Sequence, residues 1–477
     1  MDAKEKIPIH KQMKLDYLRY ALKTIKGRAL PALEDNLKPV QRRVLFAANK
    51  VSRNFTKSSK LVGHVLGNYH PHGDQSVYRT ICSLVQTFNM NYPLLTGQGN
   101  FGSRDGDNPA AQRYTEVKLS DFAKDVCFEE LDSVPYKENY DGTRKEPVFL
   151  PVKLPLALLN GVQGTATGYR TSIPPHNLNE LVDLLIKVIE KDYVTDKQIK
   201  DSVKGPDFPT GGIIKNSKKN ISKGLLKGRG SVIIYPEYKT GEASYGRKKI
   251  IITEIPYKSN KARLVKKIAD AVNNGRIGGI SDLIDESDRD GIRISIVTKK
   301  RVSKPEEIME ELIDKSIGRI SYRFNYSPIF VDGNEPVRLN IRDIASRFIE
   351  FRRKILRKHL NLRMENIDDE IDKAKAQLKY IKNYKKFSKK IIEADSIDKI
   401  YNSLTQYSLT HDQIDHILDT KITQTKKGGK EIEEKLDKLI KKKKRTKDNI
   451  ENVDGLIIKQ LEDLEDKYGR KRRTKIK

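Results

Sequence analysis

A seven-residue apolar repeat in the last third of the chain constrains the fold more than any other feature of this sequence. Over residues 360–381 apolar side chains recur at strictly alternating spacings of four and three, and a shorter run of the same kind covers residues 344–355. A second run starts near residue 432 and reaches residue 464, with an interruption at Lys443 and Thr446. Such spacing is typical of long coiled-coil helices.

Two long helices that enclose a shorter helical stretch favour an antiparallel hairpin. We expect the coiled coil over residues 336–385 and 430–468, and a globular helical tip over residues 386–429. A single amphipathic bundle is the alternative. The length of the repeat without capping residues favours the hairpin.

The rest of the chain changes character near residue 146. Residues 1–26 predict an arm that ends in a helix, and residues 27–145 a small helical domain with loops. Residues 146–335 alternate strand-like and helical patterns, which predicts a mixed α/β segment. Within these parts we expect helices at 40–49, 76–88, 178–190 and 261–273, and strands at 231–238, 249–257 and 291–298.

The charge of the chain indicates a polyanionic partner. Its 477 residues include 93 Lys and Arg against 64 Asp and Glu, which gives a formal net charge of +29. Domains with a pI above ~9 usually bind nucleic acid, although a solvated lysine-rich surface is the alternative. The same alternatives, contact with DNA or a solvated end, apply to the basic tail at residues 469–477.

Composition also argues against several other classes of protein. The two cysteines, Cys82 and Cys127, form no Cys-x-x-Cys pair, so a zinc site or a disulfide framework is not expected. The first residues have no apolar signal-peptide core. No stretch approaches the ~18–20 apolar residues of a membrane span. We therefore expect a cytoplasmic protein without a membrane partner.

Tyr114 follows an arginine in the string AAQRYTE, and this pair indicates phosphoryl-transfer chemistry. A tyrosine oxygen that replaces a sugar oxygen on phosphorus turns one phosphodiester into another, so cutting stays reversible through a covalent intermediate. Arg113 favours the phenolate and can hold the attacked phosphate. With 21 tyrosines in the chain, however, the pair alone is a weak signal.

Further motifs on both sides of Tyr114 strengthen that signal. In chain order they are GRALP (27–31), LKPVQRRV (37–44), YHPHGD (69–74), GQGNFGS (97–103), NYDG (139–142), PPHN (174–177), GPDFP (205–209), EIPY (254–257), KARL (261–264) and YGRKRRT (468–474). Together they resemble the breakage-reunion subunit of type IIA DNA topoisomerases, most closely the A subunit of DNA gyrase and topoisomerase IV. The resemblance spans nearly the whole chain.

The resemblance implies an α+β multidomain fold and an assembly. Residues 27–145 would form a winged-helix DNA-gate domain, residues 146–335 an α/β tower domain, and residues 386–429 an exit-gate dimerisation tip. A homodimer would join two ATPase/toprim B-type subunits as A2B2, cut both strands of double-stranded DNA with a stagger, and pass a second duplex. The resemblance also implies that Mg²⁺ and ATP are bound by the partner subunit. This sequence shows neither the acidic metal motif nor a Gly-rich phosphate loop.

The resemblance also assigns the catalytic residues. Tyr114 would be the nucleophile that forms a 5′-phosphotyrosyl bond. Arg113 and Arg28 would place positive charge on the non-bridging oxygens. His70 and His72 would contact phosphate, and His72 would act as an acid or base. No metal ligand is expected on this chain.

Three further residues match a DNA-binding motif. Lys38, Arg42 and Arg43 lie in LKPVQRRV. Arg42 and Arg43 open a helix whose apolar residues should face the core, so we expect both arginines to be exposed and to position phosphates. Contacts of this kind carry no sequence information by themselves.

Thr165 marks a departure from the family. In gyrase-like proteins an isoleucine at this position wedges between base pairs, which unstacks them and bends the DNA. Threonine is smaller and polar, so we expect weaker bending, or a wedge formed by Val162.

A second departure is that no strand-repeat segment for a DNA-wrapping pinwheel follows YGRKRRT, as in short phage or viral subunits, so relaxation or decatenation is expected rather than supercoiling.

Two rival interpretations remain. Instead of the active cleaving subunit, the chain would be a catalytically inactive basic DNA-binding scaffold of the same fold, or a gyrase core whose wrapping domain is missing. In each case we expect it at the nucleoid, or in the host cytoplasm if it is of phage or viral origin.

Overall fold

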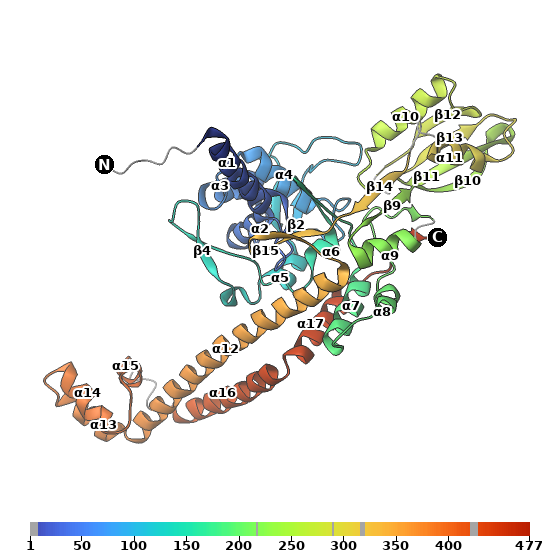
Figure 1. Cartoon of the computed structure of the whole chain (residues 1–477). Helices are drawn as coiled ribbons and strands as arrows, with labels where there is room; N and C mark the ends of the chain where they lie inside the picture. Colours follow the sequence, from blue (N-terminus) through green and yellow to red (C-terminus); the bar gives the residue numbers. More distant parts are fainter. Residues whose placement is uncertain (1–7, 216–217, 289–290, 315–319, 420–427) are drawn as a thin grey trace. The chain divides into compact units, whose positions relative to one another are not determined.

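The chain, seen in a computed structural model, divides into two compact units (Figure 1). The structure describes residues 8–215, 218–288, 291–314, 320–419 and 428–477. The first unit comprises the residues up to Arg352 together with Ile458–Lys477, and the second is Arg353–Ile457. Helices α12 (Ile341–Lys382) and α17 (Val453–Tyr468) contribute residues to both units. The prediction of a mixed α+β chain with a long helix is confirmed, whereas the domain assignments stay predictions.

The N-terminal part of the first unit combines helices with a small antiparallel sheet. Its helices are α1 (Ile9–Thr24), the π-helical turn η1 (Ile25–Ala29), α2 (Pro39–Val51), α3 (Ser58–Asn68), α4 (Asp74–Val85) and α5 (Asp121–Cys127). Its strands β1 (Thr56–Lys57), β2 (Leu95–Gln98) and β3 (Glu116–Leu119) pair in the order β1-β3-β2. Helix α2 begins at Pro39 because the first helical position needs no N–H donor. The helices expected at 40–49 and 76–88 are confirmed as α2 and α4.

Short elements connect this region to the α/β part of the unit. They are η2 (Leu131–Ser133), β4 (Tyr136–Glu138), β5 (Lys145–Pro147), α6 (Leu156–Asn160), β6 (Val162–Ala166) and β7 (Tyr169–Ile173). Strands β6 and β7 form a two-stranded antiparallel hairpin in which Thr165 is opposite Arg170. Val162 is opposite the buried Ile173 at the base of the hairpin, so Val162 does not stand at its exposed end.

The α/β part contains two four-stranded sheets, in the orders β10-β11-β13-β12 and β14-β9-β8-β17. Its helices are α7 (Leu178–Glu190), α8 (Asp196–Ser202), α9 (Lys218–Lys227), α10 (Lys261–Asn273), α11 (Pro305–Asp314) and the turn η3 (Ser244–Gly246). Its strands are β8 (Ile213–Ile214), β9 (Gly230–Tyr235), β10 (Glu237–Ala243), β11 (Arg247–Glu254), β12 (Ile280–Asp285), β13 (Ile294–Thr298), β14 (Tyr322–Tyr326), β15 (Ile329–Asp332), β16 (Glu335–Arg338) and β17 (Lys475–Ile476). The expected strands are confirmed as β9, β11 and β13, with shifted ends.

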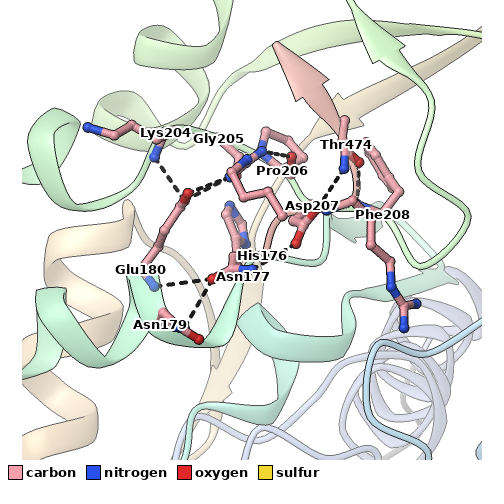
Figure 2. A network of polar contacts seen from close by, with 12 residues as sticks. His176, Asn177, Asn179, Glu180, Lys204, Gly205, Pro206, Asp207, Phe208 and Thr474 are labelled. Carbon is pink, nitrogen blue, oxygen red and sulfur yellow. Dashed lines mark hydrogen bonds and ion pairs between the residues drawn. The ribbon is translucent and has the colours of Figure 1, made fainter. Parts of the chain in front are cut away.

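The basic C-terminal segment is part of the fold rather than a solvated tail (Figure 2). Strand β17 pairs in parallel with β8 and completes the second sheet. The buried Asp207 accepts hydrogen bonds from the backbone N–H groups of Arg473 and Thr474, each at 2.9 Å. Nη1 of Arg472 donates to both carboxylate oxygens of Glu180, at 2.7 and 2.8 Å. The interpretation of this segment as a solvated end is therefore wrong.

Asn177 links the same network to helix α7. Its side-chain oxygen accepts from the backbone N–H of Asn179 at 3.1 Å, which caps the helix. Its amide nitrogen donates to Asp207 and to the carbonyl of Arg470, each at 3.0 Å. The motifs PPHN, GPDFP and YGRKRRT, far apart in sequence, thus meet in one structural network.

In the second unit α12 runs antiparallel to α16 (Gly428–Glu451), as Figure 1 also shows. Two ion pairs define the direction, because Asp368 pairs with Lys443 at 2.5 Å and Lys382 with Glu433 at 3.7 Å. The interruption of the apolar spacing at Lys443 does not end the helix, since α16 continues to Glu451. The ion pair with Asp368 accommodates the charged residue on the helix.

The tip of the second unit has a small core of its own. Its helices are α13 (Tyr384–Ile392), α14 (Ile397–Thr405) and α15 (His411–Leu418). They bury Phe387, Leu404 and Ile414 together. Residues 420–427 of the predicted tip, and residues 1–7 of the predicted arm, lie outside the described residues.

Candidate active site

Tyr114 stands on the connection that leads into strand β3. Its side chain is 65% exposed. The guanidinium carbon of the exposed Arg113 lies 4.6 Å from the centre of the Tyr114 ring, within the range of a cation–π contact. The backbone N–H of Tyr114 donates to the carbonyl of Ala111 at 2.9 Å, which closes a tight turn. The turn presents the phenol to solvent, where a large substrate can reach it.

The residue after Tyr114 holds this turn from inside the protein. Thr115 is fully buried, with its Oγ1 hydrogen-bonded to Oγ of Ser58 at 2.8 Å. Oη of Tyr78 in α4 lies 2.9 Å from the same Oγ1 and donates to the carbonyl of Ala110 at 2.6 Å. The backbone N–H of Ser58 donates to the carbonyl of Thr115 at 2.9 Å. Helices α3 and α4 therefore fix both ends of the segment that carries Tyr114.

A further contact joins the tyrosine segment to the histidine motif. Nε2 of Gln112 donates to Oδ2 of Asp74 at 3.1 Å, and Asp74 is the last residue of YHPHGD. The backbone N–H of Ser59 donates to the carbonyl of Gln112 at 3.1 Å. The structure thus joins two motifs through residues that are 38 positions apart in the sequence.

The two histidines of that motif have different environments. Their rings stack with centroids 4.2 Å apart, but His70 is buried and His72 is exposed. Nη1 of Arg43 lies 2.9 Å from Nδ1 of His70, and because arginine only donates, His70 accepts there and has its proton on Nε2. Burial, followed by the charges of His72 and Arg43, lowers the pKa of His70 to about 4. His70 is therefore neutral at pH 7, and His72 is the histidine that a substrate can reach.

The expectation that Arg42 and Arg43 are both exposed is wrong. Arg42 is buried, and its guanidinium forms two hydrogen bonds to the carboxylate of the buried Asp35. Arg43 donates to both oxygens of the buried Glu146, at 2.7 and 2.8 Å. A buried charge needs a partner of opposite sign, and the two carboxylates hold these arginines in place inside the fold around α2. Phosphate positioning by Arg42 is excluded in this arrangement.

Arg28 and Thr165 lie on segments that pack closely against each other. Gly164 of β6 faces η1, where a Cβ atom would stand only 2.0 Å from the carbonyl oxygen of Ala29. Only glycine fits this approach of two backbones. Arg28 precedes Ala29 and Thr165 follows Gly164, and both side chains are exposed. The charge of Arg28 also contributes to the lowered pKa of His70, which places Arg28 within electrostatic range of the histidines.

Lys38 lies beside the same hairpin. Its Nζ donates to the carbonyl of Gln163 at 2.6 Å, and burial lowers its pKa. Among the described residues neither Arg28 nor His72 forms a hydrogen bond or ion pair with Tyr114. The predicted site residues therefore divide into one group around Tyr114 and another around η1 and the hairpin.

Sequence reasoning missed the residues that support these groups. Thr115 and Tyr78 hold the turn of Tyr114, and Gln163 accepts from Lys38. The signal for Thr115 was its place in AAQRYTE, whereas Tyr78 gave no local signal because its partner is 37 residues away.

In the ranges that the structure describes, no three His, Cys, Asp or Glu side chains are placed to hold a metal ion. The same ranges contain no helix that is long and apolar enough to cross a membrane.

Comparison with known proteins gives a consistent result. Residues 28–462 match the family model for the A subunit of DNA gyrase and topoisomerase IV. The A subunit of DNA topoisomerase 4 from Synechocystis is 43% identical over 373 residues, which cover 75% of this chain and 40% of that protein. The DNA gyrase A subunit of Clostridium acetobutylicum is 36% identical over 498 aligned residues, which cover 98% of this chain and 57% of that protein. The chain spans about half the length of the curated relatives it matches.

Proposed function

Since this chain belongs to the family of DNA gyrase and topoisomerase IV A subunits, we propose that it cuts and reseals double-stranded DNA as part of a type II topoisomerase. The observation that carries this proposal is the exposed Tyr114 on a turn fixed by the buried Thr115. An exposed phenol on a rigid support is what an attack on a large, stiff substrate requires.

In the proposed reaction the phenolic oxygen of Tyr114 attacks a backbone phosphorus. The bond from phosphorus to the 3′ oxygen breaks, the phenol gives up its proton, and the 3′ oxygen takes one up. A 5′-phosphotyrosyl bond holds the cut end, and attack by the 3′ hydroxyl reverses each step. The bond type is retained, so resealing needs no other source of energy.

Positive charge next to the attacked phosphate would come from this chain. Arg113 is adjacent to Tyr114, and its guanidinium offers paired N–H donors to the non-bridging oxygens. Arg28 lies on η1 and His72 in the histidine motif, and we assign both to the phosphates of the same cut. Since they make no contact with Tyr114 within the described chain, their contribution requires that DNA or a second copy bring the groups together.

We further propose a homodimer joined by two B-type partner subunits. The tip of the second unit exposes Ile392 (82%) and Ile397 (67%), which suits a contact with a second copy. Helix α1 exposes Ile9, Met13 and Tyr20 at spacings of four and seven residues, on one face of the helix, which suits a B-type partner. ATP and Mg²⁺ belong to that partner in this proposal.

Tyr114→Phe tests the proposal directly. The chain, its B-type partner and closed circular DNA are mixed, and the reaction is stopped with a denaturant. The covalent protein–DNA adduct is then measured. Wild type should form adduct, and Tyr114→Phe none, with unchanged DNA affinity. Tyr193→Phe, at another exposed tyrosine, is the matched control and should behave as wild type.

Two outcomes contradict the proposal. Adduct at the wild-type level in Tyr114→Phe would exclude Tyr114 as the nucleophile. If wild type forms no adduct with its partner but still binds DNA, the chain is a DNA-binding scaffold of the same fold.

A further inference from the structure

A small polar cavity lies at the base of the β6–β7 hairpin, inside the first unit. Its volume is about 150 Å³. Its walls come from the start of α2, the end of α6, strand β6 and the loop after β11. The lining residues include Lys38, Lys258, Gln41, Asn89 and Asn160, and none of the lining residues is acidic.

The two lysines of this cavity meet at one residue. Nζ of Lys38 donates to the backbone carbonyl of Gln163 at 2.6 Å, and Nζ of Lys258 donates to the side-chain Oε1 of the same glutamine at 3.1 Å. Lys258 follows Tyr257 of the EIPY motif, so it comes from a different part of the chain than Lys38. One glutamine thus brings two ammonium groups to the same place.

The backbone of Lys258 also has an uncommon conformation. Its φ is +61°, in the left-handed region that residues other than glycine rarely adopt. Strained residues of this kind are concentrated at ligand-binding and catalytic sites, where the surrounding structure maintains them. From this backbone position the Lys258 side chain reaches Gln163.

The positive charges in the cavity lack a carboxylate partner. Within the described ranges neither Lys38 nor Lys258 pairs with an acidic side chain. Lys258 is an exposed residue that lines the cavity, and desolvation, followed by the charge of Lys38, lowers the pKa of its ammonium group to about 8. Two like charges held together favour an anion between them, because its charge offsets their repulsion.

We propose that Lys38 and Lys258 together bind one phosphate group of the DNA backbone in this cavity. A phosphate matches a small space lined by two ammonium groups and by amide donors. Gln163 is two residues before the exposed Thr165, so the phosphate is held at the base of the hairpin, on the strand that leads to Thr165. The choice of DNA as the source of the phosphate rests on the proposed function, whereas the anion site itself rests on the cavity.

Single neutral phosphates in the DNA test the proposal. A series of duplexes is prepared in which one methylphosphonate replaces each backbone phosphate in turn, and the affinity of the full chain is measured by fluorescence anisotropy. Wild type should lose affinity at a defined set of positions. At one position of that set, the same for both variants, methylphosphonate replacement should no longer lower the affinity of Lys258→Met or Lys38→Met. Each variant should also lower the slope of log affinity against log salt by about 1.

Two control variants accompany this experiment. Lys258→Arg retains the charge and should keep the wild-type pattern. Lys191→Met, at an exposed lysine on the far end of α7, should also keep it. If Lys258→Met is sensitive to the same methylphosphonate positions as wild type, the two lysines do not share a phosphate. The same conclusion follows if the two variants lose sensitivity at different positions.

Inorganic phosphate distinguishes the two sources of the anion. It is titrated against the chain without DNA while acylation of Lys258 is followed by mass spectrometry. Protection of Lys258 by phosphate at micromolar concentration, without any sensitive methylphosphonate position, would assign the site to free phosphate and overturn the DNA assignment. Adduct formation by Tyr114 is measured separately, so failure here and failure of the proposed function give different results.

Discussion

Oη of Tyr78 lies 2.9 Å from Oγ1 of Thr115, so the residue that follows Tyr114 is tied to helix α4. Tyr114 is 65% exposed while Thr115 is fully buried. The support for the proposed nucleophile is therefore inside the protein, where a substrate never reaches it. A displacement of about 1 Å at a reacting group can lower its rate about 100-fold, so the proposed reaction should depend on this support.

Tyr78→Phe should slow cleavage more than it weakens DNA binding. The change removes the partner of the Ala110 carbonyl and one partner of Thr115. We expect adduct formation to slow about tenfold or more through misplacement of Tyr114. The free energy of unfolding should fall by about 1–3 kcal/mol because a buried acceptor loses its donor. Single-turnover adduct assays and denaturant unfolding measure the two effects, and an unchanged adduct rate would contradict the prediction.

Gly164→Ala should separate the hairpin from η1. The new Cβ would stand 2.0 Å from the carbonyl oxygen of Ala29, and a backbone atom cannot move aside as a flexible side chain can. Strand β6 must shift, which displaces Thr165 relative to Arg28. We expect less adduct and a lower melting temperature. Gly241→Ala, where nothing lies within 4 Å of the added carbon, is the control and should leave both unchanged.

Stability should fall on acidification because of His70. Its pKa is lowered to about 4 in the folded chain, whereas an unfolded histidine titrates near ~6.5. Between these values the unfolded chain binds a proton that the folded chain does not, so stability decreases as the pH falls from about 6.5 to about 4.

Unfolding free energies at several pH values measure this effect. The loss between pH 7 and pH 5 should be smaller in His70→Gln than in wild type. His10→Gln, at an exposed histidine of α1, should retain the full loss. An identical pH dependence in wild type and His70→Gln would refute the assignment. The more deeply buried His176, whose pKa burial also lowers to about 4, leaves a residual dependence in each protein.

Asp207→Ala should release the C-terminal strand. It leaves the N–H groups of Arg473 and Thr474 without their acceptor, and the loss at the buried Thr474 alone should lower the free energy of unfolding by about 1–3 kcal/mol. We expect faster amide hydrogen exchange in β17 and in its neighbour β8. Asp201→Ala, at an exposed aspartate of α8, should leave exchange in β17 unchanged. Wild-type exchange rates in Asp207→Ala would show that β-pairing alone holds the segment.

Arg352→Met should be among the most destabilising single changes. Arg352 and Glu130 form a fully buried ion pair with Nη2 and Oε1 3.0 Å apart, and Gln460 accepts from the same nitrogen. Removal of one buried partner leaves an uncompensated charge, which typically lowers stability by about 3–5 kcal/mol. The double variant Arg352→Met/Glu130→Leu should recover part of the loss in urea unfolding. If the double variant loses as much free energy of unfolding as the two single variants added together, this interpretation is contradicted.

The sequence alone determined the elements whose signals are local. The helices expected at 178–190 and 261–273 match α7 and α10, because Asn177 and Asn260 cap them from adjacent positions. The heptad repeat likewise identified α12, since its apolar spacing is read along a single helix. The Arg-Tyr pair with its neighbouring motifs indicated Tyr114 as a candidate, but gave no sign of the buried hydroxyls that hold it.

Only the tertiary structure decided what each charged side chain does. Arg43 looked like an exposed phosphate contact, yet its carboxylate partner Glu146 is 103 residues away. Arg472 looked like part of a solvated tail, yet it binds Glu180, 292 residues away. Periodicity predicts which face of a helix is apolar, but not which distant carboxylate meets an arginine on it. The same holds for Lys38 and Lys258, whose shared position depends on the packing of the hairpin against two other parts of the chain.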